Sequence, residues 1–219
     1  MNLLRAAITF CLCFAAPGAG PVAAAQPDGG AIEAPKAPSQ LIVEGARREA
    51  EHQTPYVMEY HVIPYPGGDV PADTGVCTDL VVRAFRNAGI DVQKLLHVDR
   101  AAHPEVYPTQ IWAYKRPDAN IDHRRCQNLA VWFRRQAKSL AIETDAAHLA
   151  QWQPGDVVFY VRSGASDPWH VAVVSERKDA DGMPLIIDSY PPATSETHRL
   201  DTWSPIHSHF RYPSEKPKP

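Results

Sequence analysis

The stretch Pro154-Gly-Asp-Val-Val-Phe-Tyr160, followed by Trp169-His-Val-Ala-Val-Val-Ser175, marks the change from helical to strand patterns in this sequence. Residues 185–189 and 207–212 continue the pattern: all four segments are rich in Val, Ile, Phe and Tyr, with Ser-Gly, Asp-Gly or Pro-Pro turns between them. Short segments of this composition, bounded by turn residues, are typical of strands. Because helical patterns precede residue 154, the sequence predicts an α+β fold with helices packed on a small antiparallel sheet.

Four segments before that stretch repeat apolar residues at helical spacing. They are 39–52, 77–88, 92–102 and 128–138. Asp73 or Thr74 is expected to cap the helix over 77–88, and Gly89 is expected to end it. Residues 103–124 are interrupted by aromatic residues and prolines, and they are expected to form a long ordered loop.

Residues 1–25 carry the pattern of a secretory signal peptide. Arg5 precedes an apolar run of roughly 11 residues, and Ala23-Ala-Ala25 offers a cleavage site. The run is too short to span a bilayer, so an uncleaved anchor is the less favoured alternative. The sequence therefore predicts export to the periplasm, with no stable membrane insertion after the signal is removed.

The rest of the chain has the length of one domain. We expect a disordered Pro-, Gly- and Ala-rich linker over 26–38, a single domain over 39–213 and a flexible tail over 214–219. Without Arg5, 21 of the 22 basic residues stand against 25 acidic ones, and no basic run occurs. This balance excludes a nucleic-acid partner.

Two cysteines, Cys77 and Cys126, remain outside the signal peptide. Cys77 lies in the first turn of a predicted helix, where unpaired N–H groups and the helix dipole stabilise the reactive thiolate. A buried structural cysteine is the alternative for Cys77 alone. In an oxidising compartment, a Cys77–Cys126 disulfide is a further alternative, and it would consume the nucleophile.

The strand segments supply the groups that a cysteine nucleophile needs. If 170–175 and 185–189 are adjacent and antiparallel, His170 at the start of one strand lies beside Asp188 near the end of the other. The carboxylate then holds one imidazole nitrogen and leaves the second for a thiol. The ordered set Cys77, His170 and Asp188 therefore indicates nucleophilic catalysis.

The order of these motifs resembles the NlpC-type papain-like cysteine hydrolases, which include bacterial peptidoglycan endopeptidases and amidases. Two longer motifs resemble more closely the bacterial family of unknown function numbered 1287. They are Tyr65-Pro-Gly-Gly-Asp-Val-Pro-Ala-Asp-Thr-Gly-Val-Cys-Thr-Asp79 and Arg116-Pro-Asp-Ala-Asn-Ile-Asp-His-Arg-Arg125. With the strand motifs, the resemblance covers approximately residues 45–213.

The resemblance implies a papain-like, NlpC-type fold and cleavage of an amide bond in peptidoglycan peptides through a thioester. It assigns Cys77 as nucleophile, His170 as base and Asp188 as the third residue, and it implies no cofactor. Two alternatives stay open: an acyl or lipid transferase or hydrolase on the same fold, and a non-catalytic cell-wall binding module.

Other candidates for oxyanion and substrate contacts lie in the two long motifs. By resemblance, Tyr65 is a candidate to assist the backbone N–H of the nucleophile in binding the oxyanion, and Asp79 belongs to the same motif. His123, Arg124 or Arg125 is expected to meet a peptide carboxylate, since arginine binds carboxylates bidentately. The alternative is a buried polar network that only orders the loop.

No metal site is expected. Residues 118–122 open like a calcium loop, but His123 and Leu129 stand where that loop needs glycine and glutamate. His207 and His209 have no further ligand at metal-binding spacing, and surface histidines explain them as well.

Overall fold

The computed structural model describes residues 35–111 and 116–214 of the 219-residue chain. The predicted signal peptide, most of the predicted linker and nearly all of the predicted tail lie outside the described residues. The described elements belong to one compact unit, which spans residues 35–219. In the ranges that the structure describes, no helix has the length and apolar character needed to cross a membrane.

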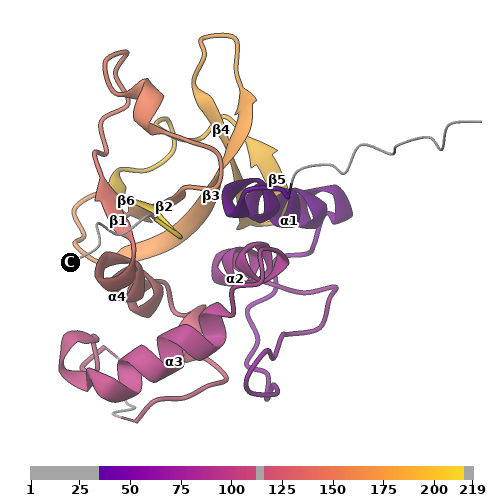
Figure 1. Ribbon diagram of the computed structural model, residues 1–219, viewed down its shortest axis with the longest axis vertical. Coiled ribbons are helices and arrows are strands. Elements are labelled where there is room, and N and C mark those ends of the chain that lie inside the picture. The colour runs from indigo at the N-terminus through magenta and orange to yellow at the C-terminus, as the bar shows by residue number, and fades with distance from the viewer. Residues whose placement is uncertain (1–34, 112–115, 215–219) are drawn as a thin grey trace, which may run out of the picture. The chain divides into compact units, whose positions relative to one another are not determined.

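The elements run from helices to strands along the chain (Figure 1). The helices are α1 (Pro38–His52), α2 (Cys77–Asn87), α3 (Val92–Ala102) and α4 (Cys126–Gln136). The strands are β1 (Lys138–Leu140), β2 (Val157–Val161), β3 (Pro168–Lys178), β4 (Pro184–Tyr190), β5 (Ala193–Thr197) and β6 (Ile206–Arg211). They form one antiparallel sheet in the order β1-β6-β2-β3-β4-β5, so the α+β prediction is confirmed.

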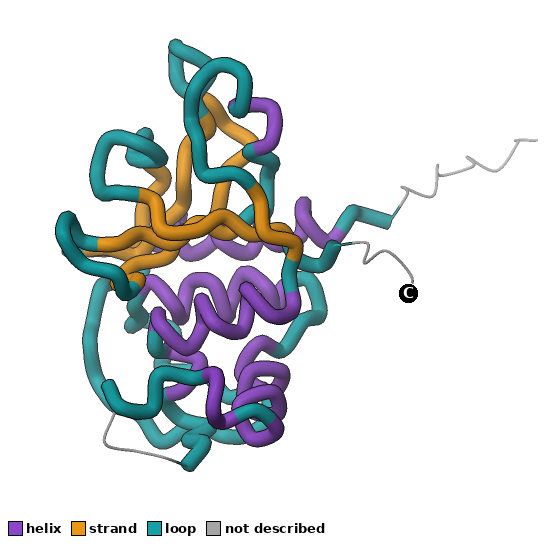
Figure 2. Tube along the Cα trace, turned by 90° about the vertical axis from the view of Figure 1, so that its left-hand side faces the viewer, coloured by secondary structure: helices purple, strands orange, loops and turns teal. Residues whose placement is uncertain are grey.

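Helices cover one face of the sheet (Figure 2). Since successive strand residues point to opposite faces, Phe159 and Val171 pack in the core beneath the helices, whereas Tyr160 and Ala172 belong to a second buried cluster on the other face. Loops complete that second cluster, to which Trp152 contributes. The central strands β2 and β3 are therefore buried on both faces.

Several element boundaries differ from the prediction. Helix α4 begins at Cys126 and ends at Gln136, because Lys138 pairs with β6 as part of the short edge strand β1. Strands β1 and β5 were not predicted, and the predicted linker ends earlier because Pro38 is the first residue of α1. Short segments at sheet edges carry too little pattern to identify from sequence.

The start of α2 is capped differently from the prediction. Neither Asp73 nor Thr74 caps it: the cap residue is Val76, whose backbone N–H donates to Asp79 Oδ2 at 2.8 Å. At the other end, Gly89 has a φ of +76° directly after the helix, as expected for a glycine stop. The motif residue Asp79 thus orders the first turn of the helix that carries Cys77.

Candidate active site

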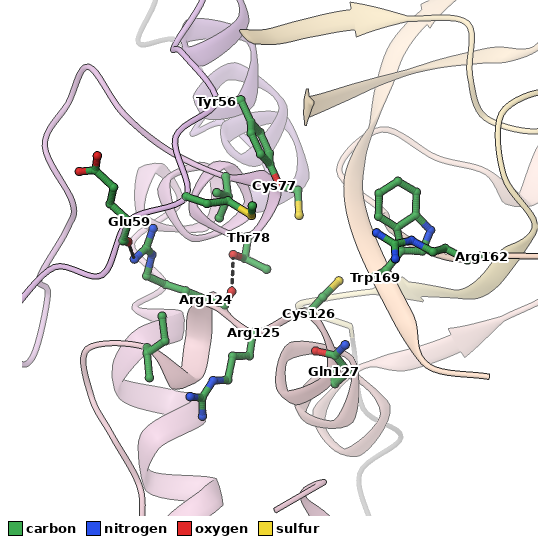
Figure 3. Close-up of a pocket in the computed structure, with 13 residues that line it drawn as sticks. Tyr56, Glu59, Cys77, Thr78, Arg124, Arg125, Cys126, Gln127, Arg162 and Trp169 are labelled. Atoms are coloured by element: carbon green, nitrogen blue, oxygen red, sulfur yellow. Dashed lines mark hydrogen bonds between the residues drawn. The ribbon is translucent and has the colours of Figure 1, made fainter. Parts of the chain in front are cut away.

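Two helices begin with a cysteine, and both cysteines line one pocket of about 600 Å³ (Figure 3). Cys77 is the first residue of α2 and Cys126 is the first residue of α4. Both side chains are buried, 5% and 7% exposed, and neither is in a disulfide. The pocket therefore holds two free thiols at helix starts, where backbone N–H groups remain unpaired.

Hydrogen bonds hold the two helix starts together. Thr78 Oγ1 donates to the carbonyl oxygen of Arg124 at 3.0 Å. Arg124 Nε and Nη2 donate to the two carboxylate oxygens of Asp79 at 2.7 and 3.0 Å. These contacts tie the first turn of α2 to the residues just before α4, and so they bring Cys77 beside Cys126.

His170 and Asp188 meet across two strands, as the strand pattern predicts. The pairing of Val174 with Ile186 aligns the start of β3 with the end of β4. His170 Nε2 lies 2.9 Å from Asp188 Oδ2, and both side chains are almost fully buried. With Nε2 held by the carboxylate, the second ring nitrogen is the one available to a thiol.

Aromatic rings surround the His170 imidazole. The ring centroids of Trp203, Trp169, Tyr190 and Tyr160 lie 4.7, 5.4, 5.9 and 6.2 Å from that of His170. This cage excludes water from the imidazole and strengthens its electrostatic interactions.

The charges of Cys77, Cys126 and His170 depend on one another. The pKa of Cys77 lies well below its usual range, and a hydrogen bond from Cys126 is the largest cause. Burial acts in the opposite direction and raises this pKa. The charge of His170, its hydrogen bond and the Val171 N–H lower the pKa further. Burial, followed by the hydrogen bond with Cys77 and then the Cys77 charge, raises the pKa of Cys126. For His170, burial would lower the pKa, but the Cys77 charge and Asp188 outweigh it and raise the pKa to about 9. The arrangement therefore favours a Cys77 thiolate beside a His170 imidazolium at neutral pH.

Tyr56, rather than Tyr65, is the tyrosine in the pocket. Tyr65 is 42% exposed, and its ring lies 4.7 Å from His97, outside the pocket lining. Tyr56 lines the pocket, and burial, together with the charges of Cys77 and Asp79, raises its pKa to about 12. An isolated bridge to Gly75 brings Tyr56 to this place, a long-range contact that no local pattern announces.

Arg124 is bound to other residues, and His123 lies outside the pocket lining. The Arg124 guanidinium binds Asp79, and its Nη1 donates to the Glu59 carbonyl at 2.7 Å. His123 is buried outside the pocket lining, and burial lowers its pKa to about 4, so the ring is neutral at pH 7. The hydrogen bonds of Arg124 are those of a buried polar network, and His123 lies away from the pocket.

Two further arginines line the pocket. Arg125 reaches it while its Nη1 lies 3.4 Å from Asp122 Oδ1. Arg162, which no sequence motif indicated, follows β2 and stacks its guanidinium 4.8 Å from the ring centroid of Trp169. Among the described residues, no carboxylate forms an ion pair with Arg162.

A second histidine–carboxylate pair lies away from the pocket. His209 Nε2 is 2.8 Å from Asp156 Oδ2, and the imidazole stacks on Trp152 at a centroid distance of 3.7 Å. His209 is buried, which corrects the expectation of a surface histidine. This pair links the residue that precedes β2 to β6, and none of its residues lines the pocket. In the part of the chain that is described, no group of three His, Cys, Asp or Glu residues could hold a metal ion.

Sequence comparison identifies a family. The family model DUF1287, described as a domain of unknown function, matches residues 43–212. The uncharacterised protein YijF of Escherichia coli K12 is 40% identical over 172 residues, which are 78% of this chain and 80% of YijF.

Two solved structures are distantly similar. A Staphylococcus aureus protein similar to a lipoprotein of the NLP/P60 family shares 15% identity over 80% of this chain and 41% of its own, with a TM-score of 0.42. An N-acetylmuramoyl-L-alanine amidase from Bacteroides uniformis shares 12% identity over 80% of this chain and 98% of its own, with a TM-score of 0.47. Likenesses this distant carry no conclusion about this chain.

The family match over most of the domain, together with the identity to YijF, shows that the chain belongs to the DUF1287 family.

Proposed function

We propose that this chain is an exported cysteine hydrolase that cleaves an amide bond in peptidoglycan peptides. One observation carries the proposal: a buried free thiol at a helix start interacts with an imidazole whose Nε2 is held 2.9 Å from a buried carboxylate. In this assignment Cys77 is the nucleophile, His170 the general acid and base, and Asp188 the orienting residue. The resemblance to NlpC-type hydrolases supplies the substrate class.

The reaction would proceed through a thioester. The Cys77 thiolate attacks the amide carbon, and the His170 imidazolium then protonates the departing amine as the C–N bond breaks. Water, deprotonated by His170, attacks the thioester and releases the carboxylate and the Cys77 thiolate. Asp188 keeps the imidazole oriented throughout and stabilises its positive charge.

Two donors at the pocket are suited to the oxyanion of the tetrahedral intermediates. One is the backbone N–H of Cys77, since α-helices leave their first N–H groups unpaired. The other is the Tyr56 hydroxyl, because the raised pKa of this phenol keeps its proton in place across the neutral range.

Arg162 is the residue that we infer binds a carboxylate of the substrate. Peptidoglycan peptides carry free carboxylates, and an arginine recognises them through paired hydrogen bonds. Of the three arginines that line the pocket, Arg124 is bound to Asp79 and Arg125 lies against Asp122. Arg162 stacks on Trp169, which orients its guanidinium at the pocket edge.

Digestion of purified peptidoglycan, followed by mass analysis of the released fragments, tests the proposal. Cys77→Ala is expected to abolish fragment release and to leave the thermal unfolding midpoint near that of the wild type. Fragment release by a folded Cys77→Ala variant would refute the mechanism.

The same protein distinguishes the alternatives. Labelling of Cys77 by acyl-chain probes, without cleavage of peptidoglycan peptides, would favour an acyl or lipid transferase. An iodoacetamide reaction at Cys77 no faster than that of an ordinary free thiol would favour a non-catalytic binding module.

A further inference from the structure

The second thiol in the pocket has no task in the proposed hydrolysis. Cys126 begins a helix, as Cys77 does; it is buried and free, and it lines the same pocket as Cys77. Figure 3 shows the two side chains entering the pocket from different helices. An isolated buried cysteine would be inert, but two thiols that line one pocket can be oxidised together.

We propose that Cys77 and Cys126 form a reversible disulfide, which makes this pocket a redox modification site where oxidation removes the nucleophile. The effect on activity rests on the proposed function; the cross-link itself does not.

The contacts around the cysteines position them for this bond. The Thr78–Arg124 hydrogen bond and the two Arg124–Asp79 hydrogen bonds already hold the first turn of α2 against the residues that precede α4. A disulfide would therefore join chain segments that are neighbours in the folded protein, with 48 residues between the cysteines in sequence.

The chemistry assigns different tasks to the two thiols. With hydrogen peroxide as oxidant, the Cys77 thiolate attacks one peroxide oxygen and the O–O bond breaks. The products are a sulfenic acid at Cys77 and a hydroxide ion, which a proton converts to water. Cys126 then attacks the Cys77 sulfur, an S–S bond forms, the S–O bond breaks, and the second oxygen leaves as water with the Cys126 proton. In total, two thiols and one peroxide become one disulfide and two waters. Exchange with an external dithiol restores both thiols.

Thiol mapping of the processed protein tests the proposal. The protein is treated with hydrogen peroxide, unfolded, alkylated with N-ethylmaleimide and digested, and its cysteine peptides are identified by mass. We expect a cross-linked Cys77–Cys126 peptide that is two hydrogen atoms lighter than the two separate peptides and that dithiothreitol separates. Hydrolytic activity is expected to be lost with the cross-link and to return with dithiothreitol.

Cys126→Ala and Cys126→Ser serve as matched variants, each compared with its own untreated sample. Without a resolving thiol, peroxide is expected to take Cys77 to sulfinic acid, which dithiothreitol does not reduce. The proposal would be overturned if peroxide took Cys77 of the wild type to sulfinic acid without any cross-link. It would also be overturned if both thiols of the wild type were still alkylated after a treatment that oxidises Cys77 in the variants.

The two proposals can fail separately. A reversible cross-link in a protein that never cleaves peptidoglycan supports the redox site and overturns the proposed function. Cleavage by a wild-type protein that loses activity to peroxide permanently, without a cross-link, overturns only the redox site.

Discussion

Replacing Asp188 with Asn tests whether the carboxylate stabilises the His170 cation. Asp188→Asn keeps the size of the side chain and removes its charge. The hydrogen bond is 2.9 Å long, and its partners are 1% and 0% exposed, so it lies out of reach of solvent screening. A hydrogen bond to a charged group contributes about 1.5–3 kcal/mol. At 1.36 kcal/mol per pKa unit, the pKa of His170 should fall by about one to two units from its value of about 9.

The lower pKa of His170 should in turn raise the pKa of Cys77, because the His170 cation helps to hold the pKa of that thiol down. A variant with less imidazolium has less thiolate at neutral pH. The rate of iodoacetamide alkylation at Cys77, followed by peptide mass mapping across roughly pH 5–10, measures this without a substrate. We expect the rising limb of the rate profile to move to higher pH in Asp188→Asn.

Asp156→Asn is the matched control. Asp156 Oδ2 lies 2.8 Å from His209 Nε2 in a comparably buried pair that does not line the pocket. This variant should retain the wild-type alkylation profile at Cys77. Superimposable profiles for Asp188→Asn and the wild type would refute the reasoning, and equal shifts in both variants would show that the effect is not specific to Asp188.

Three further predictions concern stability and substrate binding. Arg124→Met leaves the buried Asp79 carboxylate unpaired and should cost about 3–5 kcal/mol of unfolding free energy, measured by urea denaturation; a cost below about 1 kcal/mol would contradict a structural role. Arg162→Gln should raise KM roughly tenfold for peptides with a free carboxylate while kcat changes little, and amidated peptides should show no such rise; equal effects on both would exclude Arg162 as the carboxylate contact. Because the pKa of His170 is raised from 6.5 to about 9, its contribution to stability is fully present below pH 6.5 and lost as the pH rises through 9. The difference in urea stability between wild type and His170→Gln should shrink over this range, and a constant difference would contradict the raised pKa.

The strand pattern predicted that His170 and Asp188 meet, on the condition that their strands are adjacent and antiparallel, and β3 and β4 meet that condition. A strand alternates its faces every residue, and antiparallel neighbours reverse direction, so two local segments define which side chains meet. The helices were equally accessible to prediction, because their apolar residues repeat within a few positions. Cys77 at the start of α2 follows from the same local pattern.

The pocket contacts between distant segments depended on tertiary structure. Tyr56 reaches the pocket through a bridge to Gly75, Arg162 enters it from the end of β2, and Cys126 meets Cys77 because α4 begins beside α2. Such contacts are set by how whole elements pack, and no repeat within one segment encodes them.

The order of helices and strands and the place of Cys77 at a helix start follow from periodicity within short segments. The meeting of His170 with Asp188 also needs their two strands to be antiparallel neighbours, as β3 and β4 are. That Arg124 is bound to Asp79, and that a second cysteine lies in the same pocket as Cys77, depends on how distant elements pack. A buried charge pairs with the partner that packing places within reach, and a thiol at a helix start contacts the element that packs opposite it.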